Sequence, residues 1–328
     1  MHIYNRRRSG QAKIFSTKAH PMKTSHLLQL LLLSAVWGMS FILISISGHV
    51  FPPLWVALLR CTFGAILLWI VLFAGKHQLP PRRLFLWLFL VALFNNAIPF
   101  TFFARGEQVV PSSTAAILNA TTPIWTLLLS LAVHKARTSK LIICGVLLGF
   151  SGVLFVVYGQ DSGQGPAVNH TAYLHGVVYI ALAALGYAIA TTLAKMKLQG
   201  LDPIGLATTQ LSLGSLMLLP VAFAGPHPAA LKAASIAAII LLGFAGSGLA
   251  FLLYYNLLAH ISATRVVAVT FLLPIWGLFW GYLAHEAIGW TAYAGVVIVI
   301  AGLVLMNFQA FQPAQSPAPC PLEPEPQS

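Results

Sequence analysis

Long apolar runs recur ten times along this chain, and they constrain its fold more than any other feature. A helix that crosses a bilayer needs about 20 mostly apolar residues. The runs of about this length are 26–47, 53–74, 84–104, 112–133, 141–158, 173–194, 204–224, 234–256, 262–284 and 289–308. Only 7% of the residues are charged, against ~25% in ordinary soluble proteins, so lipid must solvate much of the surface. We therefore predict an all-α integral membrane protein with ten transmembrane helices.

The basic residues lie in short clusters between alternate apolar runs. If the N-terminus is cytoplasmic, fifteen of the 18 Lys and Arg residues fall in cytoplasmic segments, and only Arg105 and Lys232 fall in external ones. An excess of Lys and Arg marks the cytoplasmic side of membrane proteins, so both termini are predicted to be cytoplasmic. Because these residues form no single basic face, the net charge of +12 does not indicate nucleic-acid binding.

Three segments lie outside the predicted helical halves. Residues 1–25 form a basic cytoplasmic arm, and residues 159–172 form the longest external loop. Residues 309–328 alternate Pro with Gln, Ser and Glu, a composition that predicts disorder.

An internal repeat joins the two halves, 26–158 and 173–308. A shift of 150 residues superimposes Gly and Pro positions, and these residues affect backbone conformation more than other residues do. The matches are Trp37 with Tyr187, Pro53 with Pro203, Gly64 with Gly214, Gly145 with Gly295 and Gly152 with Gly302; with one more residue, Pro123-Ile124-Trp125 falls on Pro274-Ile275-Trp276, and Asn119 on Thr270. Each half holds five spans, an odd number, so the second half crosses the membrane in the opposite sense. Two inverted five-helix repeats are a recurring transporter architecture.

Several short motifs occur in a fixed order along these spans. They are Ala35-Val36-Trp37-Gly38-Met39-Ser40-Phe41, Pro52-Pro53-Leu54 through Leu59-Arg60, Ser112-Ser113-Thr114-Ala115-Ala116 through Thr122-Pro123-Ile124, His285-Glu286-Ala287-Ile288, and Gly295 to Gly302. In this order the chain resembles the drug/metabolite transporter superfamily, specifically its EamA-type ten-helix members, over about residues 26–308. The chain departs from the family after the fourth span, where His134-Lys135 stands in place of a Gly-Glu pair that would match His285-Glu286.

The resemblance implies a function. It implies export or uptake of small organic metabolites, often amino acids and their relatives, across a bacterial inner (plasma) membrane. We expect a secondary transporter that works by alternating access, with export favoured.

Paired prolines mark the first candidate binding region. Pro123 and Pro274 interrupt the fourth and ninth spans at matching positions, and proline frees backbone polar groups one turn back. Polar side chains stand one turn before each proline, and a tryptophan follows. The predicted lining residues are Asn119, Thr122, Trp125, Thr270 and Trp276. Two interpretations stay open here: a substrate cavity between these spans, or a packing kink with satisfied polar groups.

Polar residues within other spans complete the candidate set. Asn95 and Asn96 lie near mid-membrane in the third span, before Pro99, a further helix-break candidate. An unpaired amide in hydrocarbon costs several kcal/mol, so these side chains line a cavity or bond across helices. Trp37 and Tyr187 lie too far from the span ends to be interfacial anchors, which leaves substrate contact or core packing. Arg60, ~10 Å into the second span, binds a substrate carboxylate, reaches out to the interface or caps backbone carbonyls.

The distribution of acids and motifs limits the other functions. All six carboxylates lie in loops, helix ends or the tail. Coupling through a mid-membrane acid is therefore disfavoured, which leaves facilitated diffusion, exchange or coupling through an end-of-helix group such as Glu107. The chain has no P-loop, no second histidine after His285-Glu286 and no metal-ligand spacing of cysteines, so we expect no cofactor and no metal.

Two alternatives to metabolite transport stay open. One is a lipid or lipid-linked flippase. The other is an intramembrane enzyme, for which Gly246-Ser247-Gly248 with His260 offers a faint serine-protease pattern, although small residues at such spacing usually serve helix packing. The expected partners are a small-molecule substrate and the lipid bilayer, without nucleic acid, for a monomer or homodimer.

Overall fold

The computed structural model describes residues 23–134, 139–159, 169–228, 230–261 and 263–311, and within these ranges it is helical without strands. Its α-helices are α2 (Thr24–Gly48), α3 (Pro53–Ala74), α4 (Phe85–Ala92), α5 (Ile98–Gly106), α6 (Ser112–Asn119), α7 (Thr122–His134), α8 (Lys140–Gly159), α9 (His170–Lys197), α10 (Pro203–Ala224), α11 (Ala233–Gly243), α12 (Ala250–His260), α13 (Ala263–Leu283) and α14 (Trp290–Phe311). A 3-10 helix, η1 (Arg82–Leu84), precedes α4. Two π-helices, η2 (Leu93–Ala97) and η3 (Phe244–Leu249), join α4 to α5 and α11 to α12.

These elements form the ten predicted spans. The run η1–α4–η2–α5 is the third span, α6 with α7 the fourth, and α11–η3–α12 the eighth. Eight spans are long and apolar enough to cross a membrane, and α13 and α14 contribute shorter apolar stretches within the described residues, Val269–Leu283 and Trp290–Met306. Every span begins and ends within four residues of its predicted range. The prediction of an all-α membrane protein is confirmed.

The ends of the predicted segments need one correction. Helix α14 continues to Phe311, three residues beyond the predicted span end at 308, because Gln309 and Ala310 are compatible with a helix and Pro313 comes only afterwards. Most of the predicted arm (1–22), external loop (160–168) and tail (312–328) lie outside the described residues.

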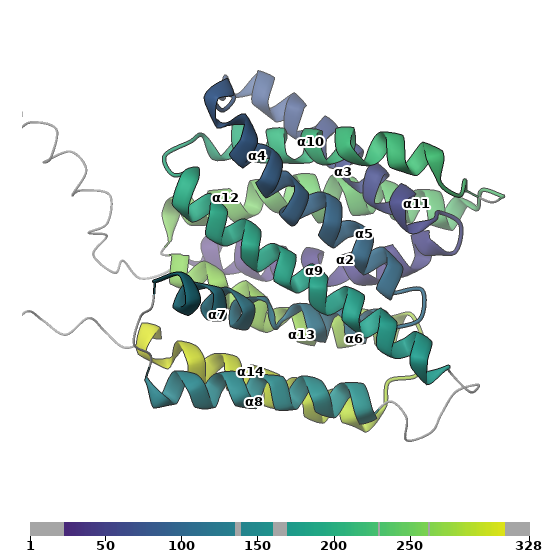
Figure 1. Cartoon of the computed structure of the whole chain (residues 1–328), viewed down its shortest axis with the longest axis vertical. Coiled ribbons are helices and arrows are strands. Elements are labelled where there is room, and N and C mark those ends of the chain that lie inside the picture. The colour runs from purple at the N-terminus through teal and green to yellow at the C-terminus, as the bar shows by residue number, and fades with distance from the viewer. Residues whose placement is uncertain (1–22, 135–138, 160–168, 229, 262, 312–328) are drawn as a thin grey trace, which may run out of the picture.

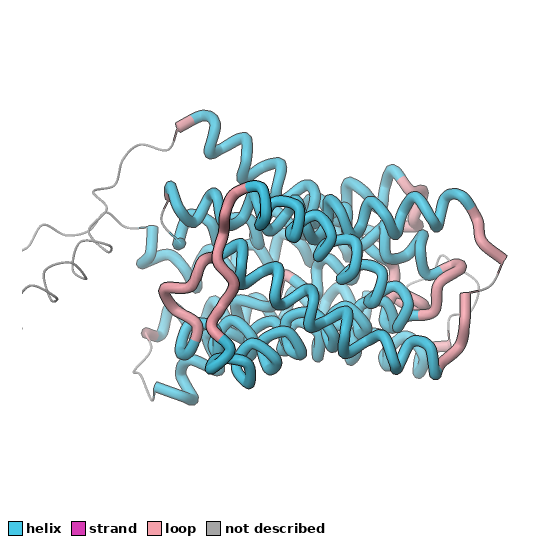
Figure 2. The backbone as a smooth tube through the Cα atoms, turned by 90° about the horizontal axis from the view of Figure 1, so that it is seen from above, coloured by secondary structure: helices cyan, strands magenta, loops and turns pink. Residues whose placement is uncertain are grey.

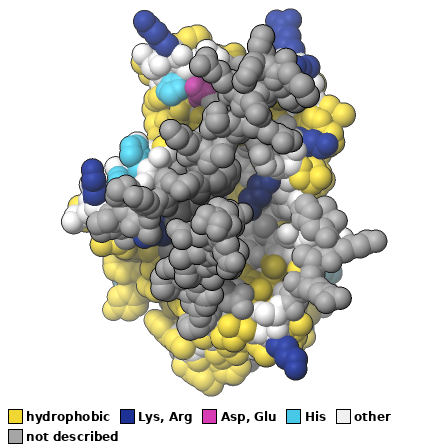
Figure 3. All heavy atoms as spheres, turned by 90° about the vertical axis from the view of Figure 1, so that its left-hand side faces the viewer, with side chains coloured by type: hydrophobic (Ala, Val, Ile, Leu, Met, Phe, Trp, Pro, Cys, Tyr) yellow, Lys and Arg dark blue, Asp and Glu magenta, His cyan; other side chains and the backbone are white. Residues whose placement is uncertain are grey.

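The helices run along one direction, and the loops gather at the two ends of the bundle (Figure 2). Helix α2 begins and α14 ends at the same end, on the left of Figure 1. We call this the terminal end and the opposite one the distal end. Figure 3 looks at the terminal end, where Lys and Arg side chains lie around the rim. Apolar side chains such as Phe73 and Val297 are exposed along the sides, at 73% and 68% of their surface, as lipid contact requires.

Matching helices of the two halves pack against each other in pairs. Helix α8 lies along α14 at one edge of the molecule, and α3 packs against α10 near the other edge (Figure 1). Between them, α2 packs against α13, α11 and α12, while α9 packs against α7, α6, α5 and α4. Each set is the counterpart of the other under the 150-residue shift, so the two repeats enclose one shared interior.

Glycines bring α8 and α14 into backbone contact. A Cβ atom on Gly302 would lie 2.5 Å from the amide nitrogen of Gly149 and 2.7 Å from the carbonyl oxygen of Gly145. The same contact recurs with the halves exchanged, since a Cβ atom on Gly152 or on Gly295 would lie 3.0 Å from the carbonyl oxygen of the other. Small residues of this kind allow close helix approach in membranes, where lipid removes the hydrophobic drive for association.

The α8–α14 contact predicts a specific loss of stability. Gly302→Ala should lower the free energy of unfolding by about 1–3 kcal/mol, because the added methyl group meets backbone that cannot rotate away. Gly48→Ala is the matched control, since nothing lies within 4 Å of a Cβ atom there and the substitution tests helix propensity alone. The measurement is thermal unfolding in detergent micelles. Equal melting of Gly302→Ala and wild type would contradict the contact.

Candidate functional site

Two related hydrogen bonds cross the interior where α3 meets α10. Arg60 of α3 donates from Nε to the Ser247 hydroxyl in η3, at 3.0 Å. Asn95 in η2 donates from Nδ2 to Oε1 of Gln210 in α10, also at 3.0 Å. The 150-residue shift places Arg60 on Gln210, and one further residue places Asn96 on Ser247. The exact counterpart of the Arg60–Ser247 pair is thus Gln210 with Asn96, whereas Gln210 bonds the adjacent Asn95. The two bonds therefore join corresponding elements of the two halves without being exact images, with a charged donor in one half and a neutral amide in the other.

The π-helices place these polar groups in the interior. A π-turn adds one residue per turn, widens the helix locally and is frequent at functional sites. Here the two π-helices occupy matching positions in the third and eighth spans. Asn95 thereby bonds across to α10, the interhelical alternative of the two predicted for it. Asn96, fully buried beside Gly214, has neither amide atom hydrogen-bonded among the described residues.

Arg60 is a buried cation without a counter-ion. It is 7% exposed, its guanidinium lies 3.9 Å over the ring centroid of Phe100, and the part of the chain that the structure describes gives it no ion pair. A ring face and a hydroxyl repay only part of the cost of removing such a charge from water. The geometry leaves Arg60 suited to an anionic group, and excludes the alternative in which it reaches the interface.

Aromatic rings surround this polar crossing. Tyr187 of α9 stacks on Phe103 with 5.9 Å between ring centroids, and Phe103 meets Phe41 edge-on at 5.5 Å. Trp37 of α2, the repeat counterpart of Tyr187, packs against Tyr254 of α12 with 5.6 Å between ring centroids. The predicted residues Trp37 and Tyr187 are therefore both half-buried in aromatic clusters within the bundle.

The predicted residues of the fourth and ninth spans lie apart from Arg60 and Asn95. The Thr122 hydroxyl donates to the Asn119 carbonyl at 2.8 Å, across the short break between α6 and α7. Trp125 meets Phe150 of α8 edge-on, with its buried indole N–H unpaired among the described residues. Trp276 donates to the Ser34 hydroxyl of α2 at 2.9 Å. Thr270 is half-buried one turn before Pro274.

The three predicted helix breaks differ in outcome. The fourth span is interrupted before Pro123, at Ala120 and Thr121. The ninth span is not interrupted, because α13 runs through Pro274 as one helix. Proline removes only its own amide from the ladder, and a lipid-embedded helix tolerates this without ending. Pro99 is the second residue of α5, directly after η2, where the third span continues without a gap.

A carboxylate from the second half closes the distal end. Glu286, between α13 and α14, accepts hydrogen bonds from the Ser112 amide at 2.9 Å, the Ser112 hydroxyl at 2.6 Å and the Ser113 amide at 3.1 Å. These amides begin α6, where the helix dipole and free N–H groups favour an anion. Small residues bring α13 against the same helix, since a Cβ atom on Gly277 would lie 2.3 Å from that of Ala116.

The described residues contain no group of three or more His, Cys, Asp or Glu side chains placed to hold a metal ion. The arrangement is instead that of an internal polar site between two symmetry-related halves. Both halves match the same family model, the EamA-like transporter family, over residues 24–158 and 174–308. The chain belongs to the EamA-like transporter family. It is a multi-pass membrane transporter and not an enzyme.

Relatives of this family member extend over nearly its whole length. It is 24% identical over 290 residues to the uncharacterized transporter YoaV of Bacillus subtilis (strain 168), which covers 86% of this chain and 96% of YoaV. It is also 24% identical over 290 residues to the uncharacterized inner membrane transporter YedA of Escherichia coli (strain K12), with 88% and 92% covered. A solved crystal structure aligns with a TM-score of 0.62 over 88% of this chain and 98% of that one, at 18% identity, which shows a common fold.

Two residues of the polar crossing were not among the predicted binding residues. Gln210 was not singled out, and Ser247 appeared only in the faint serine-protease pattern, although the repeat places them opposite Arg60 and Asn96. A search for polar residues at matched depth in both halves would have found them. Glu286 stood out only as a family-like motif, and its capping of a helix 174 residues earlier is a tertiary contact that no local pattern reveals.

The cap on α6 predicts a local effect of substitution. Glu286→Ala leaves the Ser112 and Ser113 amides without acceptors, which should cost about 1–3 kcal/mol and loosen the first turn of α6. Glu286→Gln keeps a carbonyl acceptor and should lose less. Hydrogen-exchange mass spectrometry of residues 112–118 reports the change directly. If both variants exchange as slowly as wild type, Glu286 does not hold this helix.

Proposed function

We propose that this protein is a secondary transporter that moves small organic metabolites by alternating access, with amino acids and related zwitterions as the favoured cargo and export as the favoured direction. The observation that carries the proposal is the unequal packing of α6–α7 and α13. At the distal end, α6 packs closely on α13. At the terminal end, no comparably extensive contact joins α7 to α13 among the described residues.

The internal symmetry relates the unequal packing of α6 and α7 on α13 to two access states. Under the repeat, the contact between α6 and the end of α13 corresponds to one between α7 and the start of α13. Only the first is extensively formed here, so the arrangement suits a state closed at the distal end. Exchanging the conformations of the two repeats closes the other end instead, which is how inverted repeats give two access states around one site.

The chemistry of the interior supports a zwitterionic cargo. Arg60 offers a buried cation without a counter-ion, and Asn96 an unpaired amide, both beside the crossing of α3 and α10. An unsatisfied buried polar group costs about 1–3 kcal/mol, which a bound carboxylate or amine recovers. Asn119, Trp125, Thr270 and Trp276 would then line the path between this crossing and the terminal end.

The loop charges support an orientation with both termini in the cytoplasm. Basic side chains of the terminal end include Lys76, Arg82, Arg83, Lys140, Lys195 and Lys197. Lys and Arg side chains lie around the rim of this face in Figure 3. The positive-inside rule makes this face cytoplasmic, and the proposed membrane is the inner membrane named for YedA.

The proposed site predicts a set of transport defects. Arg60→Gln, Asn96→Ala, Asn119→Ala and Trp125→Ala should each lower the transport rate by a few-fold to about a hundredfold, the value of one lost hydrogen bond or charged contact. Leu147→Ala is the control, because this α8 side chain is 64% exposed on the apolar surface. The assay is counterflow of a panel of radiolabelled neutral amino acids in proteoliposomes, normalised to folded protein.

The outcomes of that assay separate the alternatives. Normal transport by all four variants would reject the site. Failure accompanied by misfolding would assign them to packing. Scrambling of a labelled phospholipid without amino-acid counterflow would favour the flippase.

The orientation has its own test. Reporter fusions after residue 311 should be active only in the cytoplasm, and fusions within 160–168 only outside, because fifteen basic residues lie on one side and two on the other. A fusion after residue 48 should match the external pattern, and one after residue 76 the cytoplasmic one. An external C-terminal reporter would overturn the orientation.

A further inference from the structure

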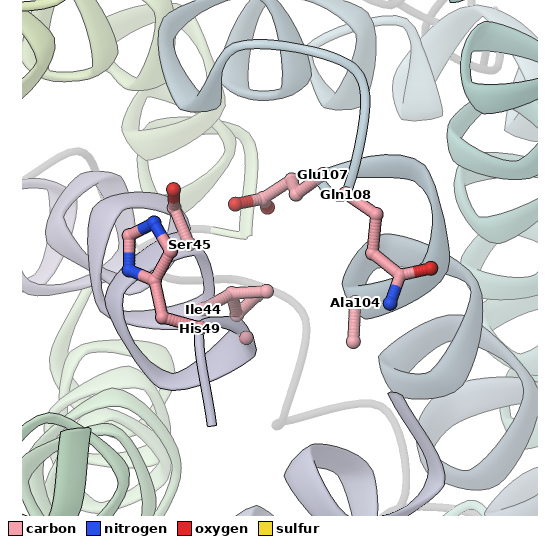
Figure 4. A pocket seen from close by; sticks show the side chains of 7 residues that line it. Ile44, Ser45, His49, Ala104, Glu107 and Gln108 are labelled. Atoms are coloured by element: carbon pink, nitrogen blue, oxygen red, sulfur yellow. The ribbon is translucent and has the colours of Figure 1, made fainter. Parts of the chain in front are cut away.

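A cavity of about 240 Å³ opens at the distal end between α2 and the end of α5. Ile44, Ser45, Gly48 and His49 line it from α2 and its C-cap, and Ala104, Glu107 and Gln108 line it from the other side. His49 and Gln108 are exposed, so the cavity reaches the distal surface. In Figure 4 the carboxyl group of Glu107 points across it toward Ser45 and His49.

The carboxyl group of Glu107 is buried and unpaired. Glu107 is 9% exposed, directly after the last residue of the third span, and its backbone amide ends α5 by donating to the Phe103 carbonyl at 2.9 Å. Neither carboxyl oxygen has a hydrogen-bond partner among the described residues. An ionised carboxylate in this condition costs several kcal/mol, whereas a protonated one is neutral and tolerates burial.

The charged groups around Glu107 act on this preference in both directions. Glu286 faces it from the loop between α13 and α14, Arg60 from α3 and His49 from α2. Helix α9 meets the end of α5 with Gly176 and Ile180, which do not titrate. Burial raises the pKa of Glu107 well above its ordinary range, Glu286 raises it further, and Arg60 lowers it. Burial and the second carboxylate dominate.

We propose that Glu107 is a proton-binding site, reached from the distal solution through the cavity beside His49, and that its proton is held in the distally closed state and released when the distal end opens. This inference goes beyond the choice of cargo, and its second half rests on the alternating access proposed above. Glu107 is thereby the end-of-helix group through which transport responds to protons.

The direction of the response follows from linkage. In the closed state the pKa of Glu107 is raised, so that state binds more protons. Parting α13 and Glu286 from α6 admits water and removes a neighbouring negative charge, so the pKa of Glu107 falls back toward its ordinary range. Between these two pKa values, each unit of falling pH should favour the closed state by about tenfold. Distal acid therefore closes the transporter, and distal base opens it.

The protonation itself is tested by infrared difference spectroscopy on the full-length protein in nanodiscs. Wild type at neutral pH should show a protonated-carboxyl C=O band that disappears on titration with base, and Glu107→Gln should lack it. Glu286→Gln should keep it, because that carboxylate is held by three donors. A wild type without the band at neutral pH, or a band that survives in Glu107→Gln, overturns the proposal whatever is transported.

The coupling to opening is tested by distance measurement. Spin labels at Val109, exposed in the turn before α6, and at Tyr282, exposed near the distal end of α13, report the separation of α6 and α13 after Cys144 and Cys320 are replaced by serine. Wild type should shift toward the longer distance with rising pH, by up to about tenfold in population per pH unit. Glu107→Gln, which imitates the protonated group, should stay at the shorter distance, and its distance distribution should not change with pH.

Control variants show which residue causes the pH dependence of the distance. His49→Gln removes the imidazole that lines the cavity, and Gln108→Ala changes an exposed lining residue, so both variants should keep the pH dependence of the distance. A pH dependence lost in His49→Gln and kept in Glu107→Gln would overturn the assignment. A titrating infrared band with one unchanging distance at every pH would leave the proton site standing and reject its link to alternating access.

Discussion

Backbone contact between α8 and α14 is the constraint on which the rest of this transporter depends. Gly145 and Gly152 face Gly302 and Gly295, and each contact is the image of the other under the internal symmetry. When two inverted repeats exchange conformations, a contact between symmetry mates maps onto itself and does not have to break. The α8–α14 pair, and the α3–α10 pair at the opposite edge, can therefore stay packed during such an exchange. Under the proposed alternating access, motion occurs where contacts lack a formed counterpart, and the packing of α6 on α13 is such a place.

The two ends of the bundle are not equivalent in energy, because the repeats differ in sequence where they close. Glu286 caps α6 at the distal end with three hydrogen bonds. Its counterpart in the first half falls at His134-Lys135, where no carboxylate is available. A ligand or a proton shifts a two-state equilibrium only by its differential affinity for the states. Under the proposed alternating access, the cap favours the distally closed state, and a ligand that opens this end has to offset the loss of these hydrogen bonds.

How far the sequence predicted this structure depends on the range of each interaction. Span positions and the repeat were predictable, because hydrocarbon thickness and glycine spacing act locally, and α3 was found at its predicted bounds, 53–74. The paired prolines misled in part: α13 continues through Pro274, since neighbouring turns absorb one missing amide. The Arg60–Ser247 bond and the burial of Glu107 depend on helices that meet only after folding. No periodicity records which helix a polar side chain will face.

In the proposed cycle, the crossing of α3 and α10 keeps the binding chemistry constant while access changes. The Arg60–Ser247 bond joins α3 to η3 and the Asn95–Gln210 bond joins η2 to α10, so corresponding elements of the two halves are held together in one state. Under the proposed exchange of the repeats these two pairs of elements correspond to each other, so a carboxylate held at Arg60 would keep its place through the cycle. The charge occurs in one half only, which would give the proposed cargo a single orientation in both states. In this proposal the gates move around a fixed anchor, and selectivity resides where the symmetry of the sequence fails.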